Sequence, residues 1–310
     1  MKKYRYACHG NYKKLITICT MVNDWTKFRK FQIHWLKKGF GDADCEFLIC
    51  DNVQRNQFDG FQAGRLFLEA AKGKYIIMVH LDSRPLETKK SILNIIDELD
   101  SIDPKWALIG NAGVHQKTGE SIILGLRMPG CPATRHKTRF VPVQALDENL
   151  LIIKADARLT FSHDLYGYHF YGLDICDLAR RIGRTIYVAN LRWYHNSHGT
   201  LNEDFHRAKK RVESKMIQYR APRIWGTNCA YLSFSGSCLM RAWAKARTCW
   251  ILRNNEHHTL GERRAAWDAG RKEFLFYPAY VLLWLFKKTG LEKRRNRRLF
   301  QRQSLWPLYG

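Results

Sequence analysis

Two side chains with metal-binding chemistry follow an apolar segment near residue 80. The segment Lys74-Tyr-Ile-Ile-Met-Val-His-Leu-Asp82 is largely apolar until it presents His80 and Asp82. This composition predicts a buried strand of a parallel sheet. In extended backbone, residues two apart point the same way, so both side chains can hold one divalent cation, which in turn would hold phosphates. The local sequence leaves open a second interpretation, a hydrogen-bonded histidine followed by a helix-capping aspartate.

Polar residues also end two earlier predicted strands. Leu15–Val22, which contains Thr20, is followed by Asn-Asp, and Glu46–Cys50 is followed by Asp51. The carboxyl ends of parallel strands meet at one sheet edge, where α/β proteins bind ligands. A carboxylate for a base or ribose and a metal for a diphosphate are what a nucleotide requires there. The alternative for Asp51 is a turn-forming Asp-Asn dipeptide.

The elements that must position these residues alternate between strand and helix up to about residue 205, the pattern of an α/β domain. Helices are expected near Thr26–Lys38, Phe61–Lys72, Glu87–Leu99 and Phe170–Ile182, and further strands at Trp106–Val114, within Phe140–Lys154 as a pair around Asp147-Glu148, and at Thr185–Ala189. Gly119–Thr138 predicts a long active-site loop, and His195-Asn-Ser-His-Gly199 an exposed polar turn.

Composition indicates a globular chain with an unusual charge. The 310 residues can form one large or two smaller domains, and the formal net charge is +24. That charge predicts attraction to a polyanion such as nucleic acid, an anionic membrane or a phosphorylated ligand. We expect residues 1–205 to form the catalytic domain and residues 206–310 a basic, aromatic-rich helical region.

Cysteine usage and hydropathy predict a cytoplasmic location. The nine cysteines are scattered without a C-x-x-C pair, which favours buried free thiols in a reducing compartment. The first residues show no secretory signal pattern, and the longest apolar run, Phe274–Phe286, is too short to span a bilayer. A peripheral position on the inner face of the membrane is the alternative.

The order of the motifs resembles a known family. Four segments come first in the chain: Leu15-Ile-Thr-Ile-Cys, Phe47-Leu-Ile-Cys-Asp51, Phe61-Gln-Ala-Gly64 and Ala71 to Asp82. Four more follow later: Leu146-Asp147-Glu148, Tyr168 to Cys176, Ala179 to Gly183 and His195 to Gly199. This series, over about two-thirds of the chain, resembles GT-A-fold, family-2-like bacterial glycosyltransferases. It is most similar to the subgroup with His-x-Asp in place of Asp-x-Asp.

The resemblance implies a fold, a reaction and a donor site. The expected fold is a nucleotide-diphospho-sugar transferase fold, a Rossmann-like mixed sheet flanked by helices. The implied reaction moves a sugar from a nucleotide-sugar donor to a saccharide or lipid-linked acceptor in bacterial surface-polysaccharide assembly, with inversion. The implied donor contacts are Thr20, Asp51, Gly64, Asp82 and Arg84, and the implied ligands of Mn²⁺ or Mg²⁺ are Asp82, His80 and His195.

The acceptor side departs from the family pattern. Relatives often carry an aspartate as general base where this chain has Gly172. Asp174 is the nearest carboxylate and His169 a second candidate, although Asp174 can equally be a helix N-terminal residue. Asp147-Glu148 can face the donor sugar or simply end a strand. Basic residues near the site or in the long loop can grip phosphate or be solvated surface charges: Arg84, Arg127, Arg135, Lys137 and Arg139.

The C-terminal tract offers a further surface. Phe274–Phe286 leads into Lys287-Lys288 and then Lys293-Arg-Arg-Asn-Arg-Arg298. Aromatic residues beside a polybasic run predict an interfacial element on anionic lipid, and the alternative is a packed helix with a solvated basic tail. Nucleic acid is disfavoured as a partner because no nucleic-acid-binding motif accompanies the charge. The rival to the enzyme is a non-catalytic polyanion-binding protein on the same fold.

Overall fold

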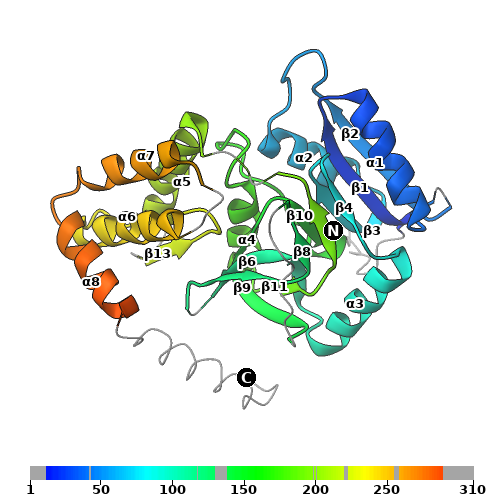
Figure 1. Ribbon diagram of the computed structural model, residues 1–310. Helices are drawn as coiled ribbons and strands as arrows, with labels where there is room; N and C mark the ends of the chain where they lie inside the picture. The colour runs from blue at the N-terminus through cyan, green and yellow to red at the C-terminus, as the bar shows by residue number, and fades with distance from the viewer. Residues whose placement is uncertain are drawn as a thin grey trace, which may run out of the picture. The chain divides into compact units, whose positions relative to one another are not determined.

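The computed structural model describes residues 12–41, 43–116, 118–129, 138–197, 199, 201–219, 223–254 and 258–288. The chain forms two compact units, of which the first comprises Met1–Gly113 with Ile122–Gly199 and the second Val114–Ser121 with Thr200–Gly310 (Figure 1). The Arg135, Lys137 and His198 positions and the Lys293–Arg298 run lie outside the described residues.

The first unit alternates strands and helices in the predicted order. Its strands, with the two that reach the boundary between the units, are β1 (Lys14–Val22), β2 (Cys45–Asp51), β3 (Gly73–Val79), β4 (Ser83–Pro85), β5 (Trp106–Gly110), β6 (Ala112–His115), β7 (Ser121–Ile123), β8 (Leu126–Arg127), β9 (Phe140–Leu146), β10 (Leu150–Lys154), β11 (Thr185–Ala189) and β12 (Trp193–His195). Its helices are α1 (Trp25–Lys37), α2 (Gly60–Ala70), α3 (Lys89–Ile102) and α4 (Tyr171–Arg181), with a 3₁₀ turn at Ala155–Ala157.

A nine-stranded mixed sheet forms the centre of this unit, in the order β2-β1-β3-β10-β5-β11-β9-β6-β7. Strand β1 is parallel to β2 and β3, whereas β10 runs antiparallel to both β3 and β5. A second sheet has the order β4-β12-β8. The predicted α/β class, a mixed sheet flanked by helices, is therefore confirmed.

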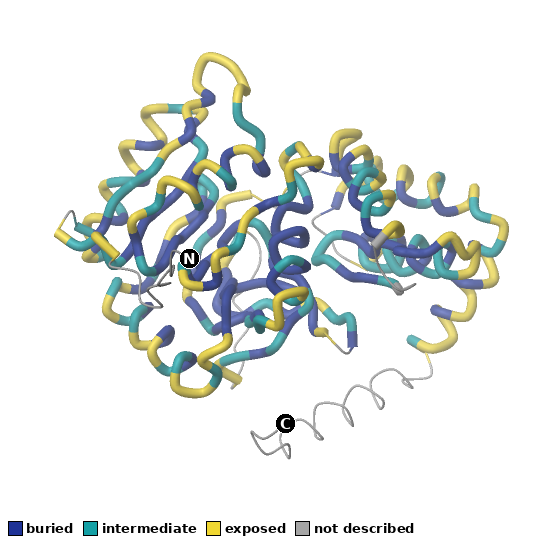
Figure 2. Tube along the Cα trace, turned by 180° about the vertical axis from the view of Figure 1, so that it is seen from behind, coloured by how far each residue is buried: buried dark blue, intermediate teal, exposed yellow. Residues whose placement is uncertain are grey.

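Amphipathic helices cover the sheet because their apolar residues recur at helical spacing. Helix α1 buries Phe28, Phe31 and Trp35, and its start is fixed by Asp24, whose carboxylate accepts the Lys27 N–H. Trp35 packs edge-on against Trp193 of the second sheet, with ring centroids 5.6 Å apart. In Figure 2 the central strands and α4 are dark blue, whereas the outer helices carry exposed stripes.

The two strands predicted around Asp147-Glu148 are present as β9 and β10, although they are not neighbours in the sheet, since β9 pairs with β11 and β10 with β3 and β5. Three other local predictions were wrong. The predicted strand Trp106–Val114 is two strands, because the chain changes neighbours at the buried Asn111. The described part of the predicted loop Gly119–Thr138 contains β7 and β8. His195 is a buried end of β12 and not part of an exposed turn.

The second unit is helical, as predicted for the C-terminal region, with one hairpin that the sequence did not indicate. Its elements are α5 (Glu203–Tyr219), β13 (Arg223–Gly226), β14 (Tyr231–Phe234), α6 (Cys238–Arg253), α7 (Leu260–Gly270) and α8 (Phe276–Lys288). The hairpin strands β13 and β14 are antiparallel. No helix among the described residues is both long and apolar enough to cross a membrane.

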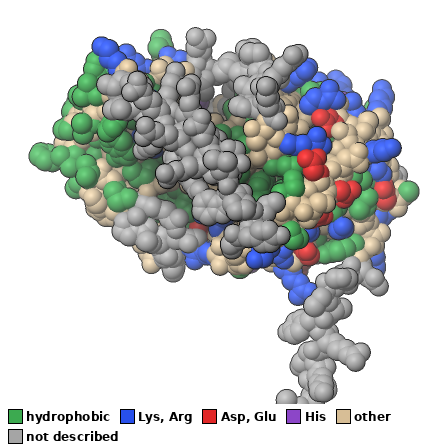
Figure 3. Space-filling model, turned by 90° about the horizontal axis from the view of Figure 1, so that it is seen from below, with side chains coloured by type: hydrophobic (Ala, Val, Ile, Leu, Met, Phe, Trp, Pro, Cys, Tyr) green, Lys and Arg blue, Asp and Glu red, His purple; other side chains and the backbone are tan. Residues whose placement is uncertain are grey.

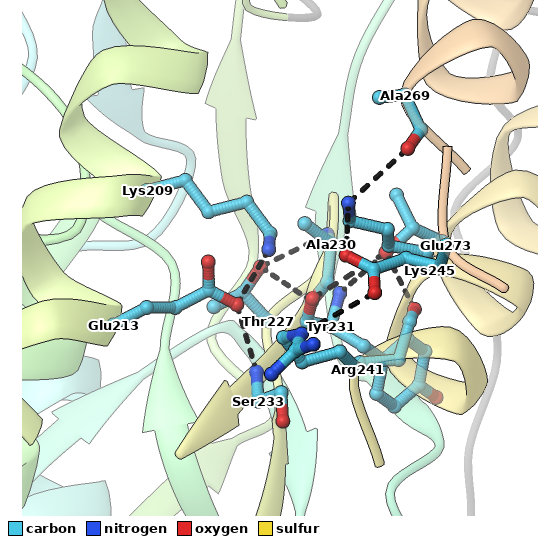
Figure 4. A network of polar contacts seen from close by, with 12 residues as sticks. Lys209, Glu213, Thr227, Ala230, Tyr231, Ser233, Arg241, Lys245, Ala269 and Glu273 are labelled. Carbon is cyan, nitrogen blue, oxygen red and sulfur yellow. Dashed lines mark hydrogen bonds and ion pairs between the residues drawn. The ribbon is translucent and has the colours of Figure 1, made fainter. Parts of the chain in front are cut away.

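Charged side chains tie the elements of the second unit together (Figure 4). The Glu213 carboxylate accepts from Lys209 Nζ at 2.7 Å and from the Ser233 N–H at 2.8 Å, which joins α5 to the hairpin. Glu273 accepts from Lys245 Nζ at 2.8 Å, which joins α6 to the segment before α8. Part of the basic excess is therefore engaged inside this unit and is not available to a partner.

Candidate functional site

The topology of the first unit brings His80, Asp82 and His195 together. His80 directly follows β3, and Asp82 lies in the turn before β4. Strand β12 pairs antiparallel with β4 so that His195 lies opposite Ser83. Residues 115 positions apart therefore meet at the carboxyl end of β3.

The three side chains form one cluster. His80 Nδ1 lies 3.3 Å from His195 Nε2, and His195 Nε2 lies 3.4 Å from Asp82 Oδ1. Metal–ligand bonds of about 2.1 Å put neighbouring ligand atoms about 3.0 to 3.4 Å apart, at right or tetrahedral angles. Within the part of the chain that the structure describes, this is the one group of three or more His, Cys, Asp and Glu side chains within reach of a shared ion. The donor set fits a divalent cation.

The electrostatics favour the ligating protonation states. Desolvation, followed by the neighbouring His195, lowers the pKa of His80 to about 4, so its ring is neutral near pH 7. Desolvation alone would raise the pKa of Asp82, but the hydrogen bond and charge of His195 outweigh it and lower that pKa to about 2. A neutral imidazole and an ionised carboxylate are the forms that bind metals.

Tyr171 supports the cluster and was missed in the sequence. Its hydroxyl oxygen lies 3.0 Å from His80 Nε2 and 3.4 Å from the Glu148 carbonyl oxygen. A second partner on the other ring nitrogen fixes the orientation of a ligating histidine. Tyr171 lies within the Tyr168–Cys176 motif, but only the packing of α4 against the sheet reveals its contact with His80.

The expected donor contacts lie on neighbouring elements. Asp51 ends β2 beside Val22 of β1, and its Oδ1 accepts the Val53 N–H at 2.9 Å. Thr20 is buried on β1, and its hydroxyl has no hydrogen-bond partner among the described residues. The Arg84 guanidinium on β4 lies 4.5 Å from the centroid of the Tyr194 ring.

Gly64 lies inside α2, where a side chain would not fit. A Cβ atom there would be 2.5 Å from the Phe161 ring, closer than such atoms approach one another. This close helix packing accounts for a glycine at residue 64 without any ligand. A donor contact of Gly64 stays a prediction.

The two candidate bases differ in their surroundings. Asp174 is buried in the first turn of α4, where its oxygens accept from Ser162 N at 2.8 Å and Ser162 Oγ at 2.7 Å. The first-turn position agrees with the helix N-terminal alternative from the sequence, and the bonds to Ser162 in addition anchor the loop before α4. His169 is partly buried, and after several larger causes it contributes to the lowered pKa of His80.

Two of the described loop arginines have defined environments. Arg139 Nε pairs with Glu98 at 2.6 Å, and Arg127 is an exposed residue of β8. Arg139 is therefore paired with a residue of α3. A phosphate contact stays a prediction for Arg127 and Arg84.

Comparison with known proteins identifies one sequence relative. No family model matches this chain. A curated protein of Fuscovulum blasticum, described as "ATP synthase subunits region ORF 6", is 28% identical over 219 residues, which cover 68% of this chain and 86% of that protein. That description names no activity for the protein.

Solved structures resemble this chain at low sequence identity. S. aureus TarS 1–349 is 12% identical with a TM-score of 0.48, covering 84% of this chain and 80% of that one. The mannosyltransferase PcManGT of Pyrobaculum calidifontis, solved with GDP-Man and Mn²⁺, is 12% identical with a TM-score of 0.45, covering 91% of this chain and 81% of that one.

Proposed function

We propose that this chain is a GT-A glycosyltransferase that transfers a sugar from a nucleotide-sugar donor to a saccharide or lipid-linked acceptor. The observation that carries the proposal is the cluster of His80, Asp82 and His195 at the carboxyl end of β3, near the Asp51 end of β2. In such sheets this edge binds nucleotides, and a cation there neutralises a diphosphate.

The residues divide the task between binding and positioning. A bound cation would stabilise the charge that develops on the diphosphate leaving group. Asp82, His80 and His195 would hold it, and Tyr171 would keep the His80 ring in orientation. Asp51 would accept hydrogen bonds from the base or ribose at the end of β2.

We further propose Mn²⁺ as the preferred ion, because two imidazoles in the ligand set favour a transition metal over magnesium. Inversion at the anomeric carbon and a place in bacterial surface-polysaccharide assembly follow from the resemblance of the motifs, and a catalytic domain ending near residue 205 follows from the strand–helix alternation of the sequence. They belong to the same proposal.

A calorimetric titration tests the donor site. We expect the wild-type chain to bind a UDP- or GDP-sugar only when Mn²⁺ is present, and Asp82→Ala to lose this binding because the diphosphate loses its cation. Asp97→Ala, on the exposed face of α3, is the matched control and should bind like wild type. Metal-independent binding, or unchanged binding by Asp82→Ala, would contradict the proposal.

A peripheral membrane position is proposed from helix α8. One face of α8, with Phe276, Ala279, Tyr280 and Leu283, is buried, whereas its other apolar residues are exposed. These exposed residues are Tyr277, Val281, Leu282, Trp284, Leu285 and Phe286. Hydrophobic side chains gather over α8 in Figure 3.

An anionic bilayer is the occupant that this face fits best. The exposed residues include aromatic rings suited to a lipid interface, and α8 ends in Lys287 and Lys288. Lys288 Nζ lies 4.7 Å from the Trp284 ring centroid, so aromatic and basic groups share one patch. The net charge of +24 adds attraction to anionic lipid.

A further inference from the structure

The backbone around Gly172 leaves no room for a side chain. A Cβ atom at this position would lie 2.8 Å from the Leu146 carbonyl oxygen and 3.3 Å from Glu148 Oε1. The volume beside the first turn of α4, where an aspartate at residue 172 would project, is therefore filled from the turn between β9 and β10. The filling group is itself a carboxylic acid.

The Glu148 carboxylate is held at the start of α4. Its Oε1 accepts the Gly172 N–H at 3.2 Å, and the Phe170 backbone also donates toward it. Helix α4 has no side-chain cap of its own, so Glu148 satisfies backbone donors that would otherwise lack an intrahelical partner. Glu148 as a whole residue is only partly buried, although its carboxylate is largely desolvated.

Glu148 also adjoins the metal cluster. Its carbonyl oxygen lies 3.4 Å from the Tyr171 hydroxyl, which lies 3.0 Å from His80 Nε2. Two hydrogen-bond distances therefore connect the backbone of Glu148 to His80 Nε2, and the other ring nitrogen of His80, Nδ1, belongs to the cluster. A general base must stand close to the reacting donor, and this chain of contacts puts the turn that carries Glu148 next to the candidate metal site.

The charge environment suits proton acceptance. Desolvation, followed by the like charge of Asp147, raises the pKa of Glu148 to about 8, although the N–H donors oppose the shift. The other titratable groups that face it are Tyr171 and Cys176 of α4, and burial raises the pKa of both. A base with a pKa near the working pH transfers protons efficiently.

We propose that Glu148 is the general base of the transfer, in place of the acid missing at Gly172; this rests on the proposed glycosyltransferase function. The acceptor hydroxyl oxygen forms the new bond to the anomeric carbon as the bond from that carbon to the diphosphate oxygen breaks. The diphosphate leaves with the electron pair, and the hydroxyl proton passes to the Glu148 carboxylate. Asp174 is then the anchor of the Ser162 loop and not the base.

Release of nucleoside diphosphate from the UDP- or GDP-sugar that wild type binds tests the proposal, with water and octyl monosaccharides as acceptors. We expect Glu148→Gln to lower kcat at least about 100-fold, the lower range for lost acid–base catalysis. Donor Kd should stay within about threefold, because the donor contacts are untouched. Glu148→Asp should retain more activity than Glu148→Gln, since it keeps a carboxylate.

A structural role gives different results. Glutamine can still accept the Gly172 N–H, so a role limited to capping α4 predicts wild-type kcat in Glu148→Gln, and that result would overturn the proposal. Wild-type kcat should rise with pH and level off above the Glu148 pKa of about 8, whereas the kcat of Glu148→Gln should not show this rise. Glu69→Gln, exposed on α2, controls for the substitution itself. A wild-type chain without nucleotide-sugar turnover overturns the proposed function and, with it, this role.

Discussion

Adding a single methyl group to Gly172 tests the crowding on which the assignment of Glu148 depends. In Gly172→Ala the new Cβ would lie 2.8 Å from the Leu146 carbonyl oxygen and 3.2 Å from Glu148 Cγ. The glutamate side chain can move, but the carbonyl belongs to the end of β9 and moves only with the strand. The variant must therefore shift either the first turn of α4 or the end of β9.

Two opposing energies decide the outcome. Alanine is favoured over glycine in a helix by at most about 1 kcal/mol, and by less in the first turn. Overpacking by one methyl group costs about 1 to 3 kcal/mol. We expect a net loss of about 1 to 2 kcal/mol of unfolding free energy, which lowers Tm by roughly 1.5 to 3 °C in a chain of this length.

Thermal unfolding followed by circular dichroism measures this shift, with Gly261→Ala as a matched control. Gly261 is also the second residue of its helix, α7, but an added Cβ would approach only Thr259 Oγ1, at 3.8 Å. Gly261→Ala should keep or raise Tm. If Gly172→Ala raises Tm as well, residue 172 is not crowded, and an acid there would not be excluded by Glu148.

Three further outcomes follow from the contacts. Asp174→Asn should lose about 2 kcal/mol of unfolding free energy, because the carboxamide keeps one uncharged oxygen acceptor for Ser162 and replaces the other acceptor by an NH2 donor; an unchanged urea midpoint would contradict this. The raised pKa of Glu148 means that its contribution to stability is complete below pH 4.5 and is lost as pH rises through about 8. The Tm of wild type minus that of Glu148→Gln should therefore fall between pH 5 and 8, and a flat difference would refute the shift. Leu285→Glu should weaken sedimentation with phosphatidylserine vesicles about tenfold. The exposed Leu260→Glu is its control, and equal binding by both variants would remove α8 from the membrane contact.

The early elements were predictable because their signals are local. Leu15–Val22 was expected as a strand and Thr26–Lys38 as a helix, and the structure has Lys14–Val22 and Trp25–Lys37. Apolar periodicity and the Asp24 cap determine these boundaries without help from distant residues. The same holds for the strand that ends before His80, so His80 and Asp82 of the candidate metal site could be found in the sequence.

His195 shows where local signals end. The segment His195-Asn-Ser-His-Gly199 has the composition of an exposed turn, yet His195 itself is only 7% exposed. The reason is a three-residue strand, β12, whose partner β4 lies more than 100 positions earlier in the sequence. A strand this short has no periodicity to detect, and its burial depends on a pairing that only the folded chain reveals.

The glycine at residue 172 and the glutamate at residue 148 are best understood as one exchange. Both side chains would enter the same volume beside the first turn of α4, so an acid can come from the helix or from the β9–β10 turn, but not from both. Taken alone, Gly172 suggests a lost base, and Glu148 suggests the end of a strand. Under the proposed assignment, they supply one carboxylate near the Tyr171–His80 pair, and the general base comes from the β9–β10 turn in place of the helix. Restoring an aspartate at residue 172 would therefore require a smaller residue at 148 and a shift of the Leu146 carbonyl, since the carbonyl contact persists whatever residue 148 is.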